Sequence, residues 1–157
     1  MSRDFARYWL LALAWTALVL YASSDTFSAQ NTGSILEAVV AFLFGRVERQ
    51  TFDTLHFLAR KGAHLAEYGI LGLLWFRAWR GTREGFTWRW ALLGMAIALA
   101  TAVADEVHQS FVPSRTGEVR DVLLDLTGAL AGQILLWLAI RWKSMRLEDC
   151  HPERLRP

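Results

Sequence analysis

Long apolar runs separated by short polar stretches make up most of the chain. Residues 8–22, 63–79, 88–108 and 119–140 are rich in apolar side chains. Extended by flanking residues to about 6–24, 61–79, 88–109 and 119–140, each run approaches the roughly 20 helical residues that cross a bilayer core. The pattern predicts an all-α fold, an integral membrane four-helix bundle in a single membrane domain over residues 1–145. Residues 146–157 are predicted to be a charged cytoplasmic tail.

The first apolar run allows two interpretations. Arg3 and Arg7 precede it, and the small residues at 22–24 resemble a signal-peptide cleavage site. Trp9, Trp15 and the hydrophobic spans that follow favour a retained first helix, because an interface-anchored aromatic helix is typical of a multi-span protein.

A shorter apolar pattern follows at residues 34–45, with apolar side chains recurring at helical spacing. About 12 residues cannot cross roughly 30 Å of hydrocarbon, so this segment is predicted to be an additional amphipathic helix that lies in the membrane interface between the first and second spans. A turn-rich piece is expected after Gly45, up to residue 58. A helix that merely covers the bundle is the simpler interpretation.

Composition supports the membrane class and excludes others. The chain is 54% hydrophobic, with eight Trp and nine Phe among 157 residues. Its net charge of +2 is carried by basic residues in loops and tails, and no basic face with interleaved aromatic residues is present, so no nucleic-acid partner is expected. Cys150 is the single cysteine, which excludes an intrachain disulfide.

Basic residues also predict orientation. With the N-terminus inside, the inner segments hold 11 of the 17 Lys and Arg residues and the outer segments hold six. This bias predicts a multi-pass protein of the bacterial inner membrane, with both termini in the cytoplasm. The bilayer itself is then the first partner of the chain.

Ionisable side chains crowd the outer ends of the second, third and fourth spans. Counting about 1.5 Å per residue from the inner anchors places the acidic residues 105, 106, 121 and 125 at the outer boundary, with His64 and Glu67 deeper. An acidic side chain at a helix centre costs about 2.5–3.5 kcal/mol, so Glu67 should face the bundle. The sequence therefore predicts a polar pocket that opens outward, either as a functional site or as a structural ion-pair network.

The candidate site residues fall into two groups. The predicted catalytic residues are His64, Glu67, Asp105 and Asp121. The predicted binding residues are Lys61, Tyr68, Glu106, Gln109, Arg115, Arg120 and Asp125. Gly128 and Gly132, four residues apart on the fourth span, are expected to permit close helix packing.

Together these residues resemble the VanZ-like family. The resemblance covers residues 60–133 and rests on three motifs, Lys61-x-x-His64-x-x-x-Tyr68-x-x-Leu71, Asp105-Glu106-x-x-Gln109-x-Phe111-x-Pro113-x-Arg115 and Asp121-x-x-x-Asp125-x-x-Gly128-x-x-x-Gly132. In that family the position of Asp125 is more often Asn, and that of Ser114 more often Gly. The resemblance implies a bacterial inner-membrane protein of the cell envelope, associated through the family's namesake with low-level teicoplanin resistance. It implies no established biochemical activity.

Three functions remain open. In the first, basic residues such as Arg60, Lys61 and Arg115 bind an anionic lipid or a cell-wall precursor through its phosphate, with the interfacial helix as a lid. In the second, His64 is the acid, base or nucleophile of a membrane-embedded hydrolase or transferase that acts on such a lipid. The third, a proton or solute path, is opposed by the apolar inner halves of the spans.

No cofactor is identified by the sequence. Asp105, Glu106, His108 and Asp121 offer ligands suited to Mg²⁺, Mn²⁺ or Zn²⁺, but the chain has no HExxH, GxSxG or P-loop motif. The sequence therefore assigns no metal.

Overall fold

The described part of the chain is entirely helical. The computed structural model describes residues 3–22, 24, 29–45, 47–111 and 118–150. Within them lie five helices, α1 (Arg3–Ala22), α2 (Ala29–Phe44), α3 (Arg49–Arg80), α4 (Trp88–Ser110) and α5 (Val119–Cys150). Three of these, α1, α4 and α5, are long and apolar enough to cross a membrane. The prediction of an all-α membrane protein is thus confirmed at the level of helices and their hydrophobicity.

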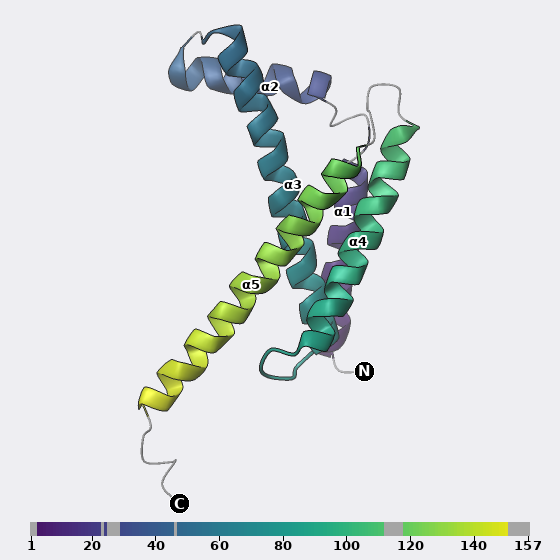
Figure 1. The fold of residues 1–157 in the computed structure, drawn as a ribbon, viewed down its shortest axis with the longest axis vertical. Coiled ribbons are helices and arrows are strands. Elements are labelled where there is room, and N and C mark those ends of the chain that lie inside the picture. The colour runs from purple at the N-terminus through teal and green to yellow at the C-terminus, as the bar shows by residue number, and fades with distance from the viewer. Residues whose placement is uncertain (1–2, 23, 25–28, 46, 112–117, 151–157) are drawn as a thin grey trace, which may run out of the picture.

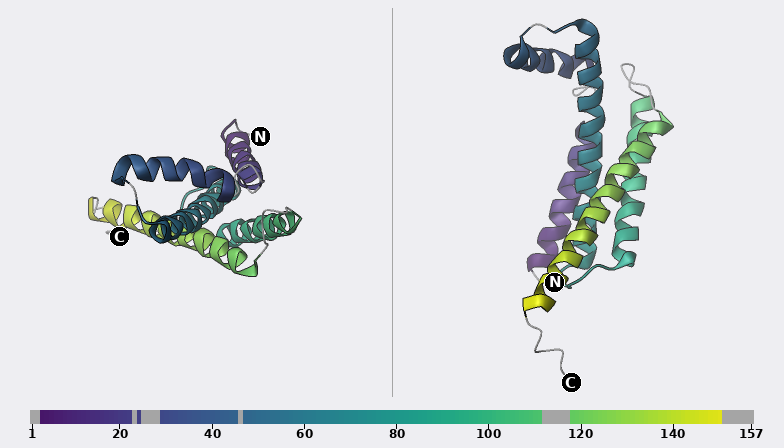
Figure 2. Two further views of the ribbon diagram at one scale, coloured as in Figure 1. Left: turned by 90° about the horizontal axis from the view of Figure 1, so that it is seen from above. Right: turned by 60° about the vertical axis from the view of Figure 1, so that its left-hand side comes forward.

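Helix α3 is the centre of the bundle. It packs against α1, α4 and α5, and α2 lies across its N-terminal end (Figures 1 and 2). Tyr68, Leu71 and Trp75 on α3 are buried against small residues of the surrounding helices. Indole hydrogen bonds tie α1 to α3: Trp15 donates to the carbonyl oxygen of Glu67, and Trp75 donates to Thr16 Oγ1, both over 3.0 Å.

The boundaries of three elements differ from the sequence prediction. No turn-rich piece separates the interfacial segment from the second span, because α3 begins at Arg49 and runs without interruption for 32 residues, about 48 Å. Helix α2 begins at Ala29, five residues before the predicted start at 34. Helix α5 continues to Cys150, so the tail predicted from 146 is helical in its first part.

Helix ends follow local chemistry. Gly45 and Gly81 end α2 and α3 with positive φ angles of 77° and 63°, a conformation that costs glycine little because it lacks a Cβ. Near the C-terminal end of α3, the Arg77 guanidinium carbon lies 4.0 Å from the ring centroid of Tyr8, and the guanidinium donates a hydrogen bond to the Tyr8 hydroxyl. The apolar side chains of α2 remain largely exposed in the isolated chain, with Phe42 at 88%.

Candidate functional site

A close crossing of α3 and α5 builds the site. A Cβ added to Gly128 would lie 2.4 Å from the carbonyl oxygen of Leu65, and one added to Gly132 would lie 2.6 Å from that of Gly69. Neither contact is possible for a real Cβ, so the two backbones meet only because both positions are glycine. The close packing predicted for this pair of glycines is therefore present, and it holds the polar residues of α3 and α5 at short range.

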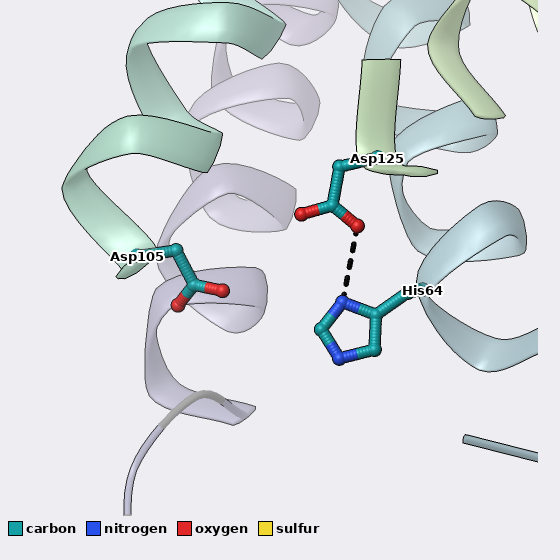
Figure 3. A group of neighbouring side chains, drawn as sticks. All are labelled: His64, Asp105 and Asp125. Carbon is teal, nitrogen blue, oxygen red and sulfur yellow. Dashed lines mark hydrogen bonds and ion pairs between the residues drawn. The ribbon is translucent and has the colours of Figure 1, made fainter. Parts of the chain in front are cut away.

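Next to this crossing, His64 meets Asp125. Imidazole Nδ1 lies 3.1 Å from Asp125 Oδ1, and the Asp125 side chain is fully buried (Figure 3). Asp125 Oδ2 has no hydrogen-bond partner among the described residues. The carboxylate that contacts His64 is thus Asp125, a predicted binding residue, and not one of the predicted catalytic residues.

Asp105 of α4 completes a cluster of three. One ligand-type atom from each of His64, Asp105 and Asp125 lies within 4.8 Å of the others. Gln109, one turn later on α4, donates from Nε2 to Asp105 Oδ2 over 3.0 Å. These four predicted site residues therefore meet in the bundle, although they come from three different helices. Figure 3 shows His64, Asp105 and Asp125.

The remaining acidic residues have other partners. Asp121 pairs with Lys61 in a half-buried ion pair outside the three-residue cluster. Glu106 Oε2 accepts a hydrogen bond from the backbone N–H of Glu118 over 2.6 Å, so it secures the start of α5. His108 is exposed on α4. The ligand set considered in the sequence, residues 105, 106, 108 and 121, is thus not brought together, because only Asp105 points into the cluster.

A cavity of about 290 Å³ adjoins the cluster. Its apolar wall comes from α1 and α2, through Val19, Ala22 and Leu36, and its polar wall comes mainly from α3. The polar lining residues are Thr32, His56, Arg60, His64, Glu67 and Asp105. A cavity with a mixed lining is therefore present beside the cluster in the described chain, and such a lining suits an amphiphilic ligand. That it opens toward the outer face stays a prediction.

Several predicted residues lie apart from this cavity. Tyr68 is fully buried beneath the cluster, and its hydroxyl has no hydrogen-bond partner among the described residues. Arg120 is exposed on α5 and is not among the residues that line the cavity. Arg115 falls on residues 112–117, outside the described part of the chain.

Sequence reasoning missed His56 and Thr32. His56 Nε2 lies 3.5 Å from Thr32 Oγ1. The His56 ring stacks on the Phe52 ring, with their centroids 5.9 Å apart. Residues 56, 60, 63, 64 and 67 follow helical spacing on one face. That signal would have revealed His56 if residues 46–58 had been interpreted as the start of α3.

Comparison with known proteins identifies a matching protein family. A family model described as VanZ/LLP1 matches residues 8–140, which include α2, α3 and α4, most of α1 and α5, and the whole polar cluster. No curated protein and no solved structure matches the chain.

Proposed function

The chain belongs to the VanZ/LLP1 family, and from this membership and the cavity beside His64 we propose that it binds an anionic, phosphate-bearing lipid or cell-wall intermediate at the outer face of a bacterial inner membrane. The observation that carries the proposal is the cavity itself, where an apolar wall from α1 and α2 faces the basic and polar side chains of α3. About 290 Å³ is enough for a head group and its first carbons. The rest of the lipid would extend along the exposed apolar face of α2.

Arg60 is the cation that lines this cavity, with His56 one turn before it. A guanidinium binds a phosphate through two parallel hydrogen bonds, so it fixes both the charge and the orientation of the head group. Lys61, the next residue, is engaged by Asp121 and holds α3 to α5. Helix α2 supplies Thr32 and Leu36 to the cavity, which is the position a lid requires.

Arg60→Gln is expected to lower the affinity for an anionic lipid such as phosphatidylglycerol about tenfold or more, because one charge-assisted interaction contributes about 1.5–3 kcal/mol. Binding to the purified protein in mild detergent can be measured by native mass spectrometry. Arg49→Gln is the matched control, since Arg49 is exposed on the same helix and pairs with Asp53 outside the cavity. Equal binding of zwitterionic lipid, or no change in Arg60→Gln, would reject the proposal.

A hydrolase or transferase acting on the same lipid is the second candidate. It is favoured by one observation, the His64–Asp125 pair, in which a buried carboxylate orients an imidazole that lines the cavity. In this mechanism His64 is the general acid or base, and Asp105 and Glu67 lie beside it as further carboxylates. An assay for phosphate release distinguishes the two candidates: an enzyme would release phosphate from the bound lipid, and a binding protein would not. The link to low-level teicoplanin resistance stays a prediction under either candidate.

We also propose that α3 is a fourth span, over about residues 61–79. His64, Glu67 and Arg77 lower its hydropathy, but the surrounding α1, α4 and α5 shield it from lipid. About 20 of the 32 residues of α3 are enough to cross a hydrocarbon core of about 30 Å. The first dozen residues would therefore extend beyond the core, toward α2. With α1 as a retained span, both termini are then cytoplasmic.

Cys150 provides a natural probe of this topology, because it is the single cysteine. A membrane-impermeant thiol reagent is expected to leave Cys150 unlabelled in intact spheroplasts and to label it after permeabilisation. In a Cys150→Ser background, Gln50→Cys is expected to label without permeabilisation, since Gln50 is exposed on the outer end of α3. Labelling of Cys150 in intact cells would contradict the proposed orientation.

A further inference from the structure

The cluster of His64, Asp105 and Asp125 offers one imidazole and two carboxylates from three helices. We propose that these side chains hold a single divalent transition-metal ion, and that Zn²⁺ fits the set best. Imidazole favours Zn²⁺ over Mg²⁺, and carboxylate oxygens complete many zinc sites. The ion would join α3, α4 and α5 directly above the glycine crossing.

The distances in the cluster are compatible with zinc. Ligands about 2.1 Å from a tetrahedral ion are about 3.4 Å from one another. His64 Nδ1 and Asp125 Oδ1 are already 3.1 Å apart. Every pair of ligand atoms lies within 4.8 Å, so the widest pair needs to close by at most about 1.4 Å. Side-chain rotation provides that much without movement of the helices.

The burial of Asp125 and Asp105 also points to a bound cation. Asp125 is fully buried, and its Oδ2, which has no hydrogen-bond partner among the described residues, lies on the side that faces Asp105 (Figure 3). Asp105 is itself only 2% exposed. Two buried carboxylates at this range repel each other strongly and require positive charge nearby. A divalent cation bound between the two carboxylates would supply such charge.

Groups around the cluster orient its ligands as in known metal sites. Gln109 donates to Asp105 Oδ2 and so fixes the rotation of that carboxylate. Hydrogen bonds of this kind raise metal affinity by holding the ligand in place before the ion binds.

The fourth coordination position of such an ion faces the cavity, because His64 and Asp105 both line it. An open position is typical of zinc sites that bind a ligand. Resting here on the proposed function, we assign that position to a phosphate oxygen of the lipid head group, with Arg60 one helical turn before His64 in the lining of the same cavity. The metal site itself does not depend on that assignment.

The test is metal content. Full-length protein, purified in mild detergent without a polyhistidine tag, is stripped with EDTA and dialysed against Zn²⁺ or Mg²⁺. Mass spectrometry of the metals is expected to give one Zn²⁺ per chain and little Mg²⁺. Asp125→Asn, Asp105→Asn and His64→Ala should each weaken Zn²⁺ binding by about 100-fold or more, and Gln109→Ala by about tenfold. His108→Ala, an exposed histidine on α4, should leave it unchanged.

Co²⁺ gives a readout that needs no variant, because Co²⁺ in a tetrahedral oxygen and nitrogen site absorbs visible light and Zn²⁺ displaces it. If monodisperse wild-type protein binds anionic lipid but neither Zn²⁺ nor Co²⁺, the metal site is rejected and the proposed function stands. Equal Zn²⁺ content in the cluster variants also rejects the metal site. Zn²⁺ binding that depends on the cluster, without any preference for anionic lipid, supports the metal site and rejects the proposed function.

Discussion

Gly128→Ala is expected to destabilise the protein by about 1–3 kcal/mol or more, because the new methyl group collides with backbone. Its Cβ would lie 2.4 Å from the carbonyl oxygen and 2.9 Å from the Cα of Leu65. Neither atom can move away without shifting α3 as a whole. Thermal unfolding in detergent, followed by circular dichroism, measures the loss.

Other glycines of the chain provide a graded series for this prediction. Gly132→Ala should also destabilise, with a contact of 2.6 Å to the carbonyl oxygen of Gly69. Gly62→Ala is the matched control: it lies on α3, nothing lies within 4 Å of its added Cβ, and alanine gains up to about 1 kcal/mol over glycine in a helix. Similar losses in all three variants would show that the crossing of α3 and α5 is not as close as described.

This crossing also explains how the site is positioned. His64 directly precedes Leu65, and Asp125 lies almost one turn before Gly128, so the backbone contact and the His64–Asp125 pair are neighbours. A helix separation large enough to admit a methyl group would lengthen the 3.1 Å contact between them. The small-residue pattern in α5 is therefore a requirement of the site as well as of packing.

Much of this arrangement could be predicted from spacing alone. Residues three, four or seven apart share a helix face, which indicated that Gly128 and Gly132 permit close approach. Counting helical rise predicted that His64 and the acidic residues of α4 and α5 lie toward one end of the spans, and His64, Asp105 and Asp125 do lie together. Their depth in a membrane stays a prediction. These inferences hold because helical rise and periodicity do not depend on tertiary structure.

Spacing could not decide which carboxylate meets which cation. Asp121 and Asp125 share one face of α5, and the crossing with α3 assigns Lys61 to the first and His64 to the second. His108 was expected beside Asp105, but its position on the helix turns it outward while Asp105 and Gln109 turn inward. A three-residue offset allows either outcome, because it corresponds to about 300° and not to a full turn.

The second prediction with a large effect concerns the buried His64–Asp125 pair. In EDTA, His64→Ala is expected to cost about 3–5 kcal/mol, because it leaves a carboxylate without its partner in a fully buried position. His64→Ala combined with Asp125→Ala should recover about 0.5–3 kcal/mol of that loss, since the unpaired charge is then gone. Unfolding by SDS in mixed micelles gives the free energies for the double-mutant cycle.

Lys61 and Asp121 form the control pair on the same two helices, with side chains 28% and 23% exposed. Water screens this pair, so its coupling should be smaller, at most about 1 kcal/mol. Repeating the measurement with Zn²⁺ distinguishes the ion pair from metal binding. A ligand that binds only the folded state raises the free energy of unfolding, so Zn²⁺ should stabilise the wild type and neither of the two His64 variants. A double variant as unstable as His64→Ala alone would mean that the Asp125 charge is already balanced by another group, and that His64 is not the partner the pair requires.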